Sequence, residues 1–443
     1  MTDCSKQLAF QGILKLPVIV DFDGGNLTSD GGVLWLRSVD EGLGLTVSLA
    51  RGLVDQRDPQ RVRHPRLEQV RQRIYQIACG YEDCDDADFL RHDPALKIAV
   101  GRLPGSDQGL SSQPTLSRFE NAAGERELKR LNGQLLRTYL ETRPKPAGRI
   151  VIDLDSTDDP THGQQAFSFY HGFYRQHMFH PLLCFDGESG DLLAVSLRPG
   201  NVHAANGVVK MLKRIVKQIR RRWPGVEIVL RADAGFCVPR LYRWCERERV
   251  GYVIGLIVNS TLKTLHDPLL EQAQALYEET RAKTRLLGEV GYRAGPWKRF
   301  RRVVMKAEVM PEGTNRRFVV TNLEGEAGSL YDFYVGRGDV ENRIKDLKNA
   351  LSADRLSCCS FAANRFRLLL HAAAYVLMHH LRRHLAGTEL AQAQFDTLRL
   401  RLLKVGARVK QSARRVWVRL ASSYPHQELW IALHSRLLVP APS

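Results

Sequence analysis

Two aspartates stand two positions apart at the end of an apolar segment. The segment GRIVIDLDST at 148–157 has the composition of a buried strand, and it carries Asp153 and Asp155. Residues i and i+2 of a strand point to the same face, so both carboxylates are expected to emerge together. Two like charges on an apolar strand are unfavourable unless a positive group neutralises them. Mg²⁺ suits that role because its natural protein ligands are carboxylates.

A third aspartate follows another apolar strand, VEIVLRADAG at 226–235. Asp233 lies at the end of this strand, as Asp155 does in the first. A lone aspartate in this place is more often a helix N-cap or a turn residue. Asp233 alone is therefore an ambiguous candidate.

A polar stripe marks the helix predicted over 331–351. At about 100° per residue, four of its side chains fall within one stripe of about 60° on the helical wheel. They are Tyr334, Arg337, Glu341 and Lys348. Geometry alone favours a solvated face with salt bridges, which is the usual place of charged helix residues.

The identities of these four residues are more specific than their geometry. Tyr-x₂-Arg-x₃-Glu-x₆-Lys resembles the YREK signature of a large group of bacterial insertion-sequence transposases, and all four positions and three spacings agree. Two further features are similar to the other acidic positions of that group. One is Asp155 with Thr157 after the first core strand, and the other is Asp233 after the fourth. The resemblance covers about residues 145–385.

This resemblance implies an α/β fold with an RNase H-like mixed-sheet core and a β-rich insertion between Asp233 and Glu341. It implies that Asp155, Asp233 and Glu341 are the catalytic residues and also the metal ligands. The cofactor would be two Mg²⁺ ions, for which Mn²⁺ substitutes, and they would activate the attacking oxygen and stabilise the leaving one. Asp155 is preferred because the group's motif is Asp-x-Thr, and Asp153 stays open as an alternate ligand.

The implied activity is DNA transposition. The protein would bind the terminal inverted repeats of its own element, cleave the DNA there and join the freed 3′-OH to target DNA, as a homodimer in the synaptic complex. Arg337 and Lys348 would meet phosphates, with Tyr334 beside them. By position only, Trp297 is expected to stack on a flipped base. The alternative, a tryptophan packed on a sheet, is at least as well supported.

The charge balance agrees with a DNA partner. The 443 residues include 65 Lys and Arg against 48 Asp and Glu, a net charge of +17 and a pI near 9.7. Such a balance is typical of nucleic-acid binders, although a basic protein without a polyanionic partner would also have it. Three basic runs are the expected sources of phosphate contacts: 210–222, 298–302 and 404–419.

The pattern of elements predicts five regions. Residues 1–145 read as a mostly helical DNA-binding region, with a helix over 64–81 and a pair of helices broken at 122–124. A Pro/Gly joint precedes the core, whose first part, 146–260, reads β-β-β-α-β-α-β and favours an α/β domain with a mixed sheet. The remaining regions are a β-rich insertion, a last part of the core with the Glu341 helix, and a basic C-terminal region: 261–326, 327–385 and 386–443.

Several classes of function find no support. The eight cysteines include no zinc-site spacing and resemble reduced cytosolic thiols. No signal peptide is expected, and the apolar run at 368–378 is too short for a membrane span. No nucleotide-binding glycine motif occurs, so no nucleotide cofactor is expected. The expected location is the bacterial cytoplasm, in association with the nucleoid.

Three alternatives remain open at this stage. VIDLDST is similar to the first motif of haloacid-dehalogenase-like phosphatases, in which Asp153 would be the nucleophile. That family also needs a lysine and a late acidic pair, whereas RADAG supplies a single acid. A DNA-binding repressor that has lost catalysis and a host nuclease that does not transpose are the other two.

Overall fold

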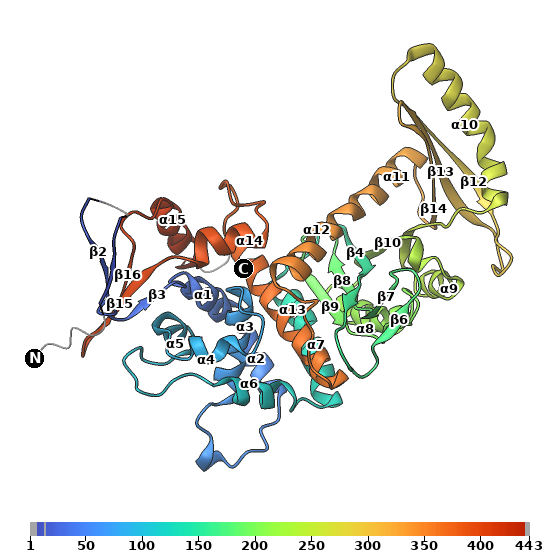
Figure 1. The fold of residues 1–443 in the computed structure, drawn as a ribbon. Coiled ribbons are helices and arrows are strands. Elements are labelled where there is room, and N and C mark those ends of the chain that lie inside the picture. Colours follow the sequence, from blue (N-terminus) through green and yellow to red (C-terminus); the bar gives the residue numbers. More distant parts are fainter. Residues whose placement is uncertain (1–6, 13–14, 439–443) are drawn as a thin grey trace, which may run out of the picture. The chain divides into compact units, whose positions relative to one another are not determined.

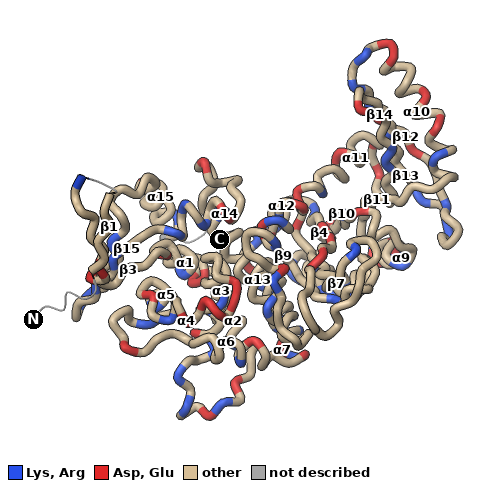
Figure 2. The backbone as a smooth tube through the Cα atoms, in the orientation of Figure 1, with Lys and Arg blue, Asp and Glu red and all other residues tan. Residues whose placement is uncertain are grey.

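The computed structural model describes residues 7–12 and 15–438, which form two compact units (Figure 1). Unit 1 comprises Met1–Phe119 with His380–Ser443, and unit 2 comprises Glu120–His379. The N-terminal and C-terminal segments, predicted from the sequence as separate regions, therefore share one unit. Lys and Arg are distributed through both units (Figure 2).

An eight-stranded mixed sheet organises unit 2, in the order β12-β13-β14-β11-β10-β4-β8-β9. Its central strand β4 pairs parallel with β10, and β10 pairs parallel with β11, while all other neighbours are antiparallel. The core strands are β4 (Arg149–Ser156), β8 (Leu182–Asp186), β9 (Leu192–Ser196), β10 (Glu227–Ala232) and β11 (Gly251–Gly255). The order β9-β8-β4-β10-β11 is that of an RNase H-like core, as predicted from the sequence.

One predicted strand is divided in the structure. The sequence HMFHPLLCFD at 177–186 favours a single strand, the second of the predicted order, but it forms the end of β7 (Gln176–Phe179) and then β8, with His180 and Pro181 between them. Proline has no backbone N–H for a strand ladder, which agrees with a break here. Strand β7 joins β5 (Asp159–Pro160) and β6 (Phe169–His171) in a separate small sheet.

Helices cover both faces of the large sheet. Apolar side chains of α7 (Glu125–Thr142), α8 (Val208–Arg222) and α9 (Pro239–Arg247) form one core with Ile152 and Leu154 of β4. On the opposite face, α11 (Ala327–Val335) packs on Val253 and Val319. Helix α13 (Phe361–Arg383) also reaches this face, because the rings of Tyr375 and Phe185 lie 5.6 Å apart.

The segment between β11 and α11 extends the sheet. It consists of α10 (Ser260–Thr280), β12 (Thr284–Tyr292), β13 (Arg301–Met310) and β14 (Gly313–Thr321). Strand β14 pairs with β11, so the three strands continue the core sheet. Helix α10 lies along β12 and β13 (Figure 1), where Leu270 and Ala273 pack on Ala307 and Val309.

The helix that carries the polar stripe is continuous but irregular. After α11 come a 3₁₀ turn (Gly336–Gly338), α12 (Asp339–Lys345) and a π-helical turn (Asp346–Ala350). Such turns change the angular spacing of side chains along a helix. Lys348 lies inside the π turn, so it does not follow the regular spacing assumed for the stripe.

Unit 1 is mostly helical. Its helices are α1 (Val33–Leu43), α2 (Leu45–Gly52), α3 (Arg66–Ala78), α4 (Asp86–Leu90), α5 (Pro94–Val100), α6 (Gln113–Glu120, whose last residue belongs to unit 2), α14 (Phe395–Leu398) and α15 (Gln427–Leu438). Strands β15 (Ala407–Gln411) and β16 (Val416–Leu420) form a hairpin that pairs with β3 (Leu27–Thr28), and β1 (Leu8–Phe10) pairs with β2 (Val18–Val20). The basic run at 404–419 therefore forms most of a two-stranded hairpin.

Contacts between distant parts of the chain hold unit 1 together. The Lys404 ammonium lies 2.8 Å from the buried carboxylate of Asp30, which also accepts a 2.8 Å hydrogen bond from Tyr81.

Residues 368–378 lie buried within α13, as expected for this apolar run. Among the described helices, none combines the length and apolar character needed to cross a bilayer. Cys4 and the first residues, on which the expectation about a signal peptide rests, lie outside the described residues.

A buried ion pair joins the two central strands. Asp153 of β4 and Arg231 of β10 are register partners, and the guanidinium donates two hydrogen bonds of 2.7 and 2.8 Å to the carboxylate. Arg343 of α12 lies 3.4 Å from the same carboxylate. The pair therefore links the centre of the sheet to the helix above it.

Replacing one partner of this pair should destabilise unit 2. We expect Arg231→Met to lower the free energy of unfolding by about 3–5 kcal/mol, because it leaves a buried charge without its main counter-charge. The double variant Arg231→Met with Asp153→Leu should recover most of that loss. Urea denaturation followed by circular dichroism measures both values, and a double variant no more stable than the single one would contradict this account.

Candidate active site

The register of β4 and β10 brings two of the predicted acids together. Leu154 and Ala232 are register partners in this parallel pair, and the next residues along the two strands are Asp155 and Asp233. The ends of parallel strands meet at one edge of a sheet, so these side chains are neighbours. Asp233 also caps the 3₁₀ turn that follows, by accepting a 2.9 Å hydrogen bond from the Gly235 N–H.

Burial governs the charge state of this pair. Asp155 is 8% exposed. Burial, and next the negative charge of Asp233, raise the pKa of Asp155 to about 6. Burial also raises the pKa of Asp233. The two carboxylates therefore form a site that favours a bound positive charge.

Arg337 supplies a positive charge at this site and connects it to Glu341. One guanidinium nitrogen, Nη2, lies 3.5 Å from Asp155 Oδ2 and 3.4 Å from Glu341 Oε1. The Glu341 side chain is 60% exposed. The third predicted acid is therefore near the other two, but it faces solvent and is paired with the arginine.

Tyr334 lies at the same sheet edge. A Cβ placed on Gly255, at the end of β11, would come within 2.7 Å of the Tyr334 hydroxyl and 2.9 Å of the Ala234 N–H nitrogen. Glycine is thus required for the tyrosine to approach the strand this closely. Burial is the largest cause of the raised pKa of Tyr334, and the negative charge of Asp233 adds to it.

Lys348 takes a different place from the other three residues of the stripe. Its ammonium lies 2.6 Å from Asp158, which follows β4, and 3.9 Å from Asp354. Burial acts to raise the pKa of Asp158, but the hydrogen bond and charge of Lys348 outweigh it and keep this pKa low. Asp159, next in the chain, is buried and its carboxylate oxygens have no hydrogen-bond partner.

The comparison with known families agrees with this geometry. The profile of a family described as transposase DDE domain group 1 matches residues 10–439, which is nearly the whole chain. The chain belongs to this transposase family. Among solved structures, the transposase chain is similar to that of a piggyBac transposase synaptic complex with hairpin DNA, at 10% identity and a TM-score of 0.45, covering 99% of this chain and 88% of that one. A comparison with curated proteins gave no match.

In the transposase, Asp153 is not free to bind a metal. Its side chain is 1% exposed, and both carboxylate oxygens accept hydrogen bonds from Arg231. Asp153 and Asp155 do share one face of β4, but an arginine and not a metal ion neutralises Asp153. Sequence reasoning missed this role of Arg231, although a charged residue within the apolar strand IVLRA was the available signal.

Trp297 also differs from expectation. Its ring is 5% exposed and packs edge-on against Tyr242 and Tyr292, at centroid distances of 5.4 and 5.5 Å. The Arg301 guanidinium lies 5.1 Å from the ring centroid. This ring is therefore not available to stack on a flipped base, and the alternative of a tryptophan packed on a sheet describes it.

A half-buried tyrosine near the acids was not anticipated. Burial, followed by the charges of Asp158, Asp155 and Asp233, raises the pKa of Tyr174 to about 12. Tyr174 belongs to the turn between β6 and β7, and nothing in the local sequence HGFYRQH marks it as part of the site. Only the packing of that turn over the sheet edge brings it there.

The three basic runs of the transposase differ in how many charges are free. Lys210, Lys213, Arg214 and Lys217 of α8 are exposed. In the second run, Arg299 and Arg301 both pair with Glu246, and Arg302 pairs with Glu289. In the third, Lys404 pairs with Asp30, while Arg408, Lys410 and Arg419 of the β15–β16 hairpin are exposed. The first and third runs thus keep the charge that phosphate contacts need.

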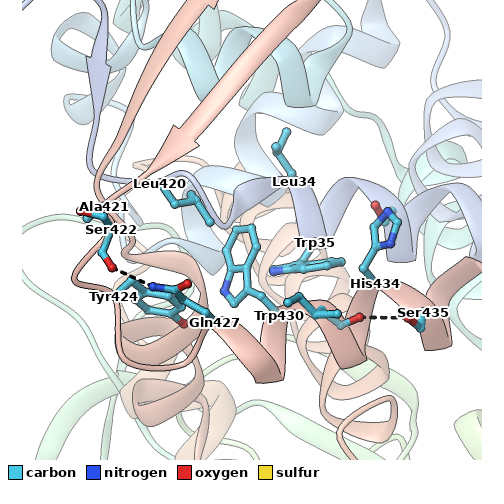
Figure 3. Close-up of a pocket in the computed structure, with 12 residues that line it drawn as sticks. Leu34, Trp35, Leu420, Ala421, Ser422, Tyr424, Gln427, Trp430, His434 and Ser435 are labelled. Atoms are coloured by element: carbon cyan, nitrogen blue, oxygen red, sulfur yellow. Dashed lines mark hydrogen bonds between the residues drawn. The ribbon is translucent and has the colours of Figure 1, made fainter.

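One large cavity is lined entirely by residues of unit 1. It has a volume of about 630 Å³ and is lined in unit 1 by α1, α15 and the segment after β16 (Figure 3). Trp35 and Trp430 meet edge to face in its wall, with ring centroids 4.9 Å apart. None of the residues that line it is acidic.

The raised pKa of Asp155 predicts an effect of pH on stability. An aspartate in the unfolded chain titrates near pH 4, whereas Asp155 titrates at about 6 in the folded chain. Between about pH 4 and 6 the folded state holds a proton that the unfolded state has released, so stability falls as pH rises through this window. Asp155→Asn should therefore be more stable than the unmodified chain at neutral pH, by up to about 3 kcal/mol.

Thermal or urea denaturation in the presence of a chelator measures this difference. We expect it to shrink to a small fraction as the pH is lowered to about 4, where the folded state is protonated at Asp155 and the unfolded state is about half protonated. Asp339→Asn is a suitable control, because Asp339 is an exposed carboxylate on α12. An Asp155→Asn gain that is the same at both pH values would contradict the assigned pKa.

Proposed function

We propose that the protein is a DNA transposase that uses Asp155, Asp233 and Glu341 to cleave the ends of its own element and join them to target DNA. The observation that carries this proposal is the meeting of Asp155 and Asp233 at the edge of an RNase H-like sheet, with Arg337 bridging Asp155 and Glu341. Membership of the transposase DDE family supports the same reaction class.

The donor set supports a divalent cation at this site. Asp155 is buried and Asp233 is half-buried, and these two like charges have one arginine as counter-charge. Carboxylate-binding Mg²⁺ or Mn²⁺ would stabilise such a combination. Within the described part of the chain, no three His, Cys, Asp or Glu side chains are grouped closely enough to hold a metal ion. Glu341 and Asp155 lie near the same guanidinium nitrogen of Arg337. We infer that Glu341 completes the site once it leaves Arg337.

Each residue of the stripe would then have a defined task. Bound divalent ions supply activation of the attacking oxygen and stabilisation of the leaving oxygen. When Glu341 turns to the acids, Arg337 is released to donate hydrogen bonds to a phosphate near the scissile bond. Tyr334 would hold the edge of the site by its close contact with Gly255. Lys348 would reach a phosphate only by exchanging its contact with Asp158.

The phosphatase alternative loses its nucleophile in this arrangement. That mechanism needs Asp153 to attack a phosphorus atom, and both oxygens of Asp153 are engaged by Arg231 in a buried pair. The four-residue stripe would also have no role in it. We therefore favour strand cleavage and transfer over phosphomonoester hydrolysis.

The finer assignments rest on the resemblance to bacterial insertion-sequence transposases. They are the YREK subgroup, recognition of terminal inverted repeats, a homodimer that bridges two ends, and association with the nucleoid. Unit 1 is the proposed DNA-binding region, because its β15–β16 hairpin presents Arg408, Lys410 and Arg419 beside an exposed Trp417.

The central test replaces each acid in turn. We expect Asp155→Ala, Asp233→Ala and Glu341→Ala each to reduce Mg²⁺-dependent nicking of element-end DNA by at least about a hundredfold, because each would remove a ligand that stabilises charge in the transition state. Binding of the same DNA should remain. Nicking on a gel and binding by fluorescence anisotropy are the two measurements.

Asp339→Ala is the matched control, because it removes an exposed carboxylate from the same helix as Glu341. Unchanged nicking in any of the three acid variants would remove that residue from the proposed set. Strand-transfer products separate a transposase from a nuclease that only cuts. End binding without any cutting by the unmodified chain would instead support the repressor alternative.

A further inference from the structure

A basic cleft lies in unit 2, at the edge of the sheet where the acid pair is found. It has a volume of about 370 Å³ and is walled by α7, α8 and the end of β9. Its lining includes five basic side chains and no acidic one: Lys129, Arg198, Lys210, Arg214 and Arg365. Of these, Arg365 is paired with Glu125, which does not line the cleft. The cleft therefore has a strongly positive wall.

Arg198 is the most unusual of these side chains, because it is buried without an acidic partner. It is 6% exposed. Its Nε donates a 2.7 Å hydrogen bond to the His180 carbonyl, and its Nη1 donates to the carbonyls of Ala204 and Asn206 at 2.6 and 2.8 Å. Its Nη2 has no hydrogen-bond partner. Burial lowers the pKa of Arg198 to about 10, and no aspartate or glutamate offsets that burial.

The start of α8 adds to the positive potential of the cleft. Asn206 and Gly207 line it immediately before the helix, and no side chain caps the first turn. The N-terminal end of a helix carries a partial positive charge and free N–H groups, which favour anions. A buried guanidinium with a free donor and a 15-residue helix thus converge on one cleft.

The cleft lies on the same edge of the sheet as the acid pair. Ser156, next to Asp155, is the register partner of Leu182 on β8, and Leu182 is the partner of Ser196 on β9. Leu182 and Ser196 both line the cleft. Two strand spacings correspond to about 10 Å. Leu182 points to the face covered by α7 and α8, whereas Asp155, whose register partner is Leu183, points to the opposite face. A DNA strand that reaches both must therefore cross the edge of the sheet, over a length of at least about three nucleotides.

We propose that this cleft binds a backbone phosphate of the DNA strand that passes through the active site, with Arg198 at its floor and Lys210 and Arg214 at its mouth. The proposal rests on the proposed function, because DNA must lie across the acids for its backbone to reach the cleft. A phosphate would supply the negative charge that Arg198 lacks. A phosphate contact at this distance from the scissile bond would fix the register of the DNA strand in the active site.

The test removes two exposed charges at the mouth. Lys210→Ala with Arg214→Ala should weaken binding of an element-end duplex roughly tenfold at moderate salt. It should also reduce the slope of log K against log salt by about 0.9 for every phosphate that the variant no longer neutralises. The matched control is Arg130→Ala with Arg137→Ala, which removes two exposed charges from α7 outside the cleft. Fluorescence anisotropy over a salt series measures both, and thermal melting checks that each variant is folded.

A second measurement locates the phosphate itself. One phosphate of the duplex at a time is replaced by a neutral methylphosphonate. The affinity of each modified duplex for the control and cleft variants is then measured. We expect one or two positions, about three nucleotides from the cleavage site, to weaken binding of the control but not of the cleft variant.

The two ideas can fail separately. If the unmodified chain nicks element ends but the cleft variant matches its control in affinity, salt slope and methylphosphonate pattern, the cleft proposal is wrong and the proposed function stands. If the unmodified chain neither binds nor cuts such DNA, both are overturned.

Discussion

The parallel pairing of β4 with β10 is the constraint on which the site depends. It sets Leu154 beside Ala232, and so leaves Asp155 and Asp233 as neighbours where the strands end. The apolar faces of the same strands are buried under α7, α8 and α9. A shift of one residue would turn those apolar side chains away from the core. The packing that stabilises the sheet therefore also keeps the two acids together.

Three of the carboxylates of β4 and the residues after it have a basic partner. Arg231 neutralises Asp153, Arg337 lies between Asp155 and Glu341, and Lys348 pairs with Asp158. The first pair is deeply buried and joins strands, so it serves the fold. The other two involve residues of the stripe and are partly accessible to solvent.

The two long basic segments of the chain contribute to different units. Helix α8 presents its charges on unit 2, beside the cleft at the edge of the sheet. The β15–β16 hairpin presents its charges on unit 1, in a sheet completed by a strand from the N-terminal segment. In the middle run, by contrast, the three arginines are paired with Glu246 and Glu289. A positive run in sequence therefore becomes a candidate DNA surface only where the fold supplies no acids to it.

Local patterns were sufficient to predict much of this protein. The apolar strands that end in acids, the order of core elements and the break between α6 and α7 could all be read from the sequence, because they depend on periodicity and on residues close in the chain. Only the tertiary structure decided that Arg231 pairs with Asp153, that Lys348 in the π-helical turn pairs with Asp158, and that Trp297 is buried. It also joined the two ends of the chain in one unit. These outcomes depend on strand register and side-chain packing between residues far apart in sequence, which local periodicity does not encode.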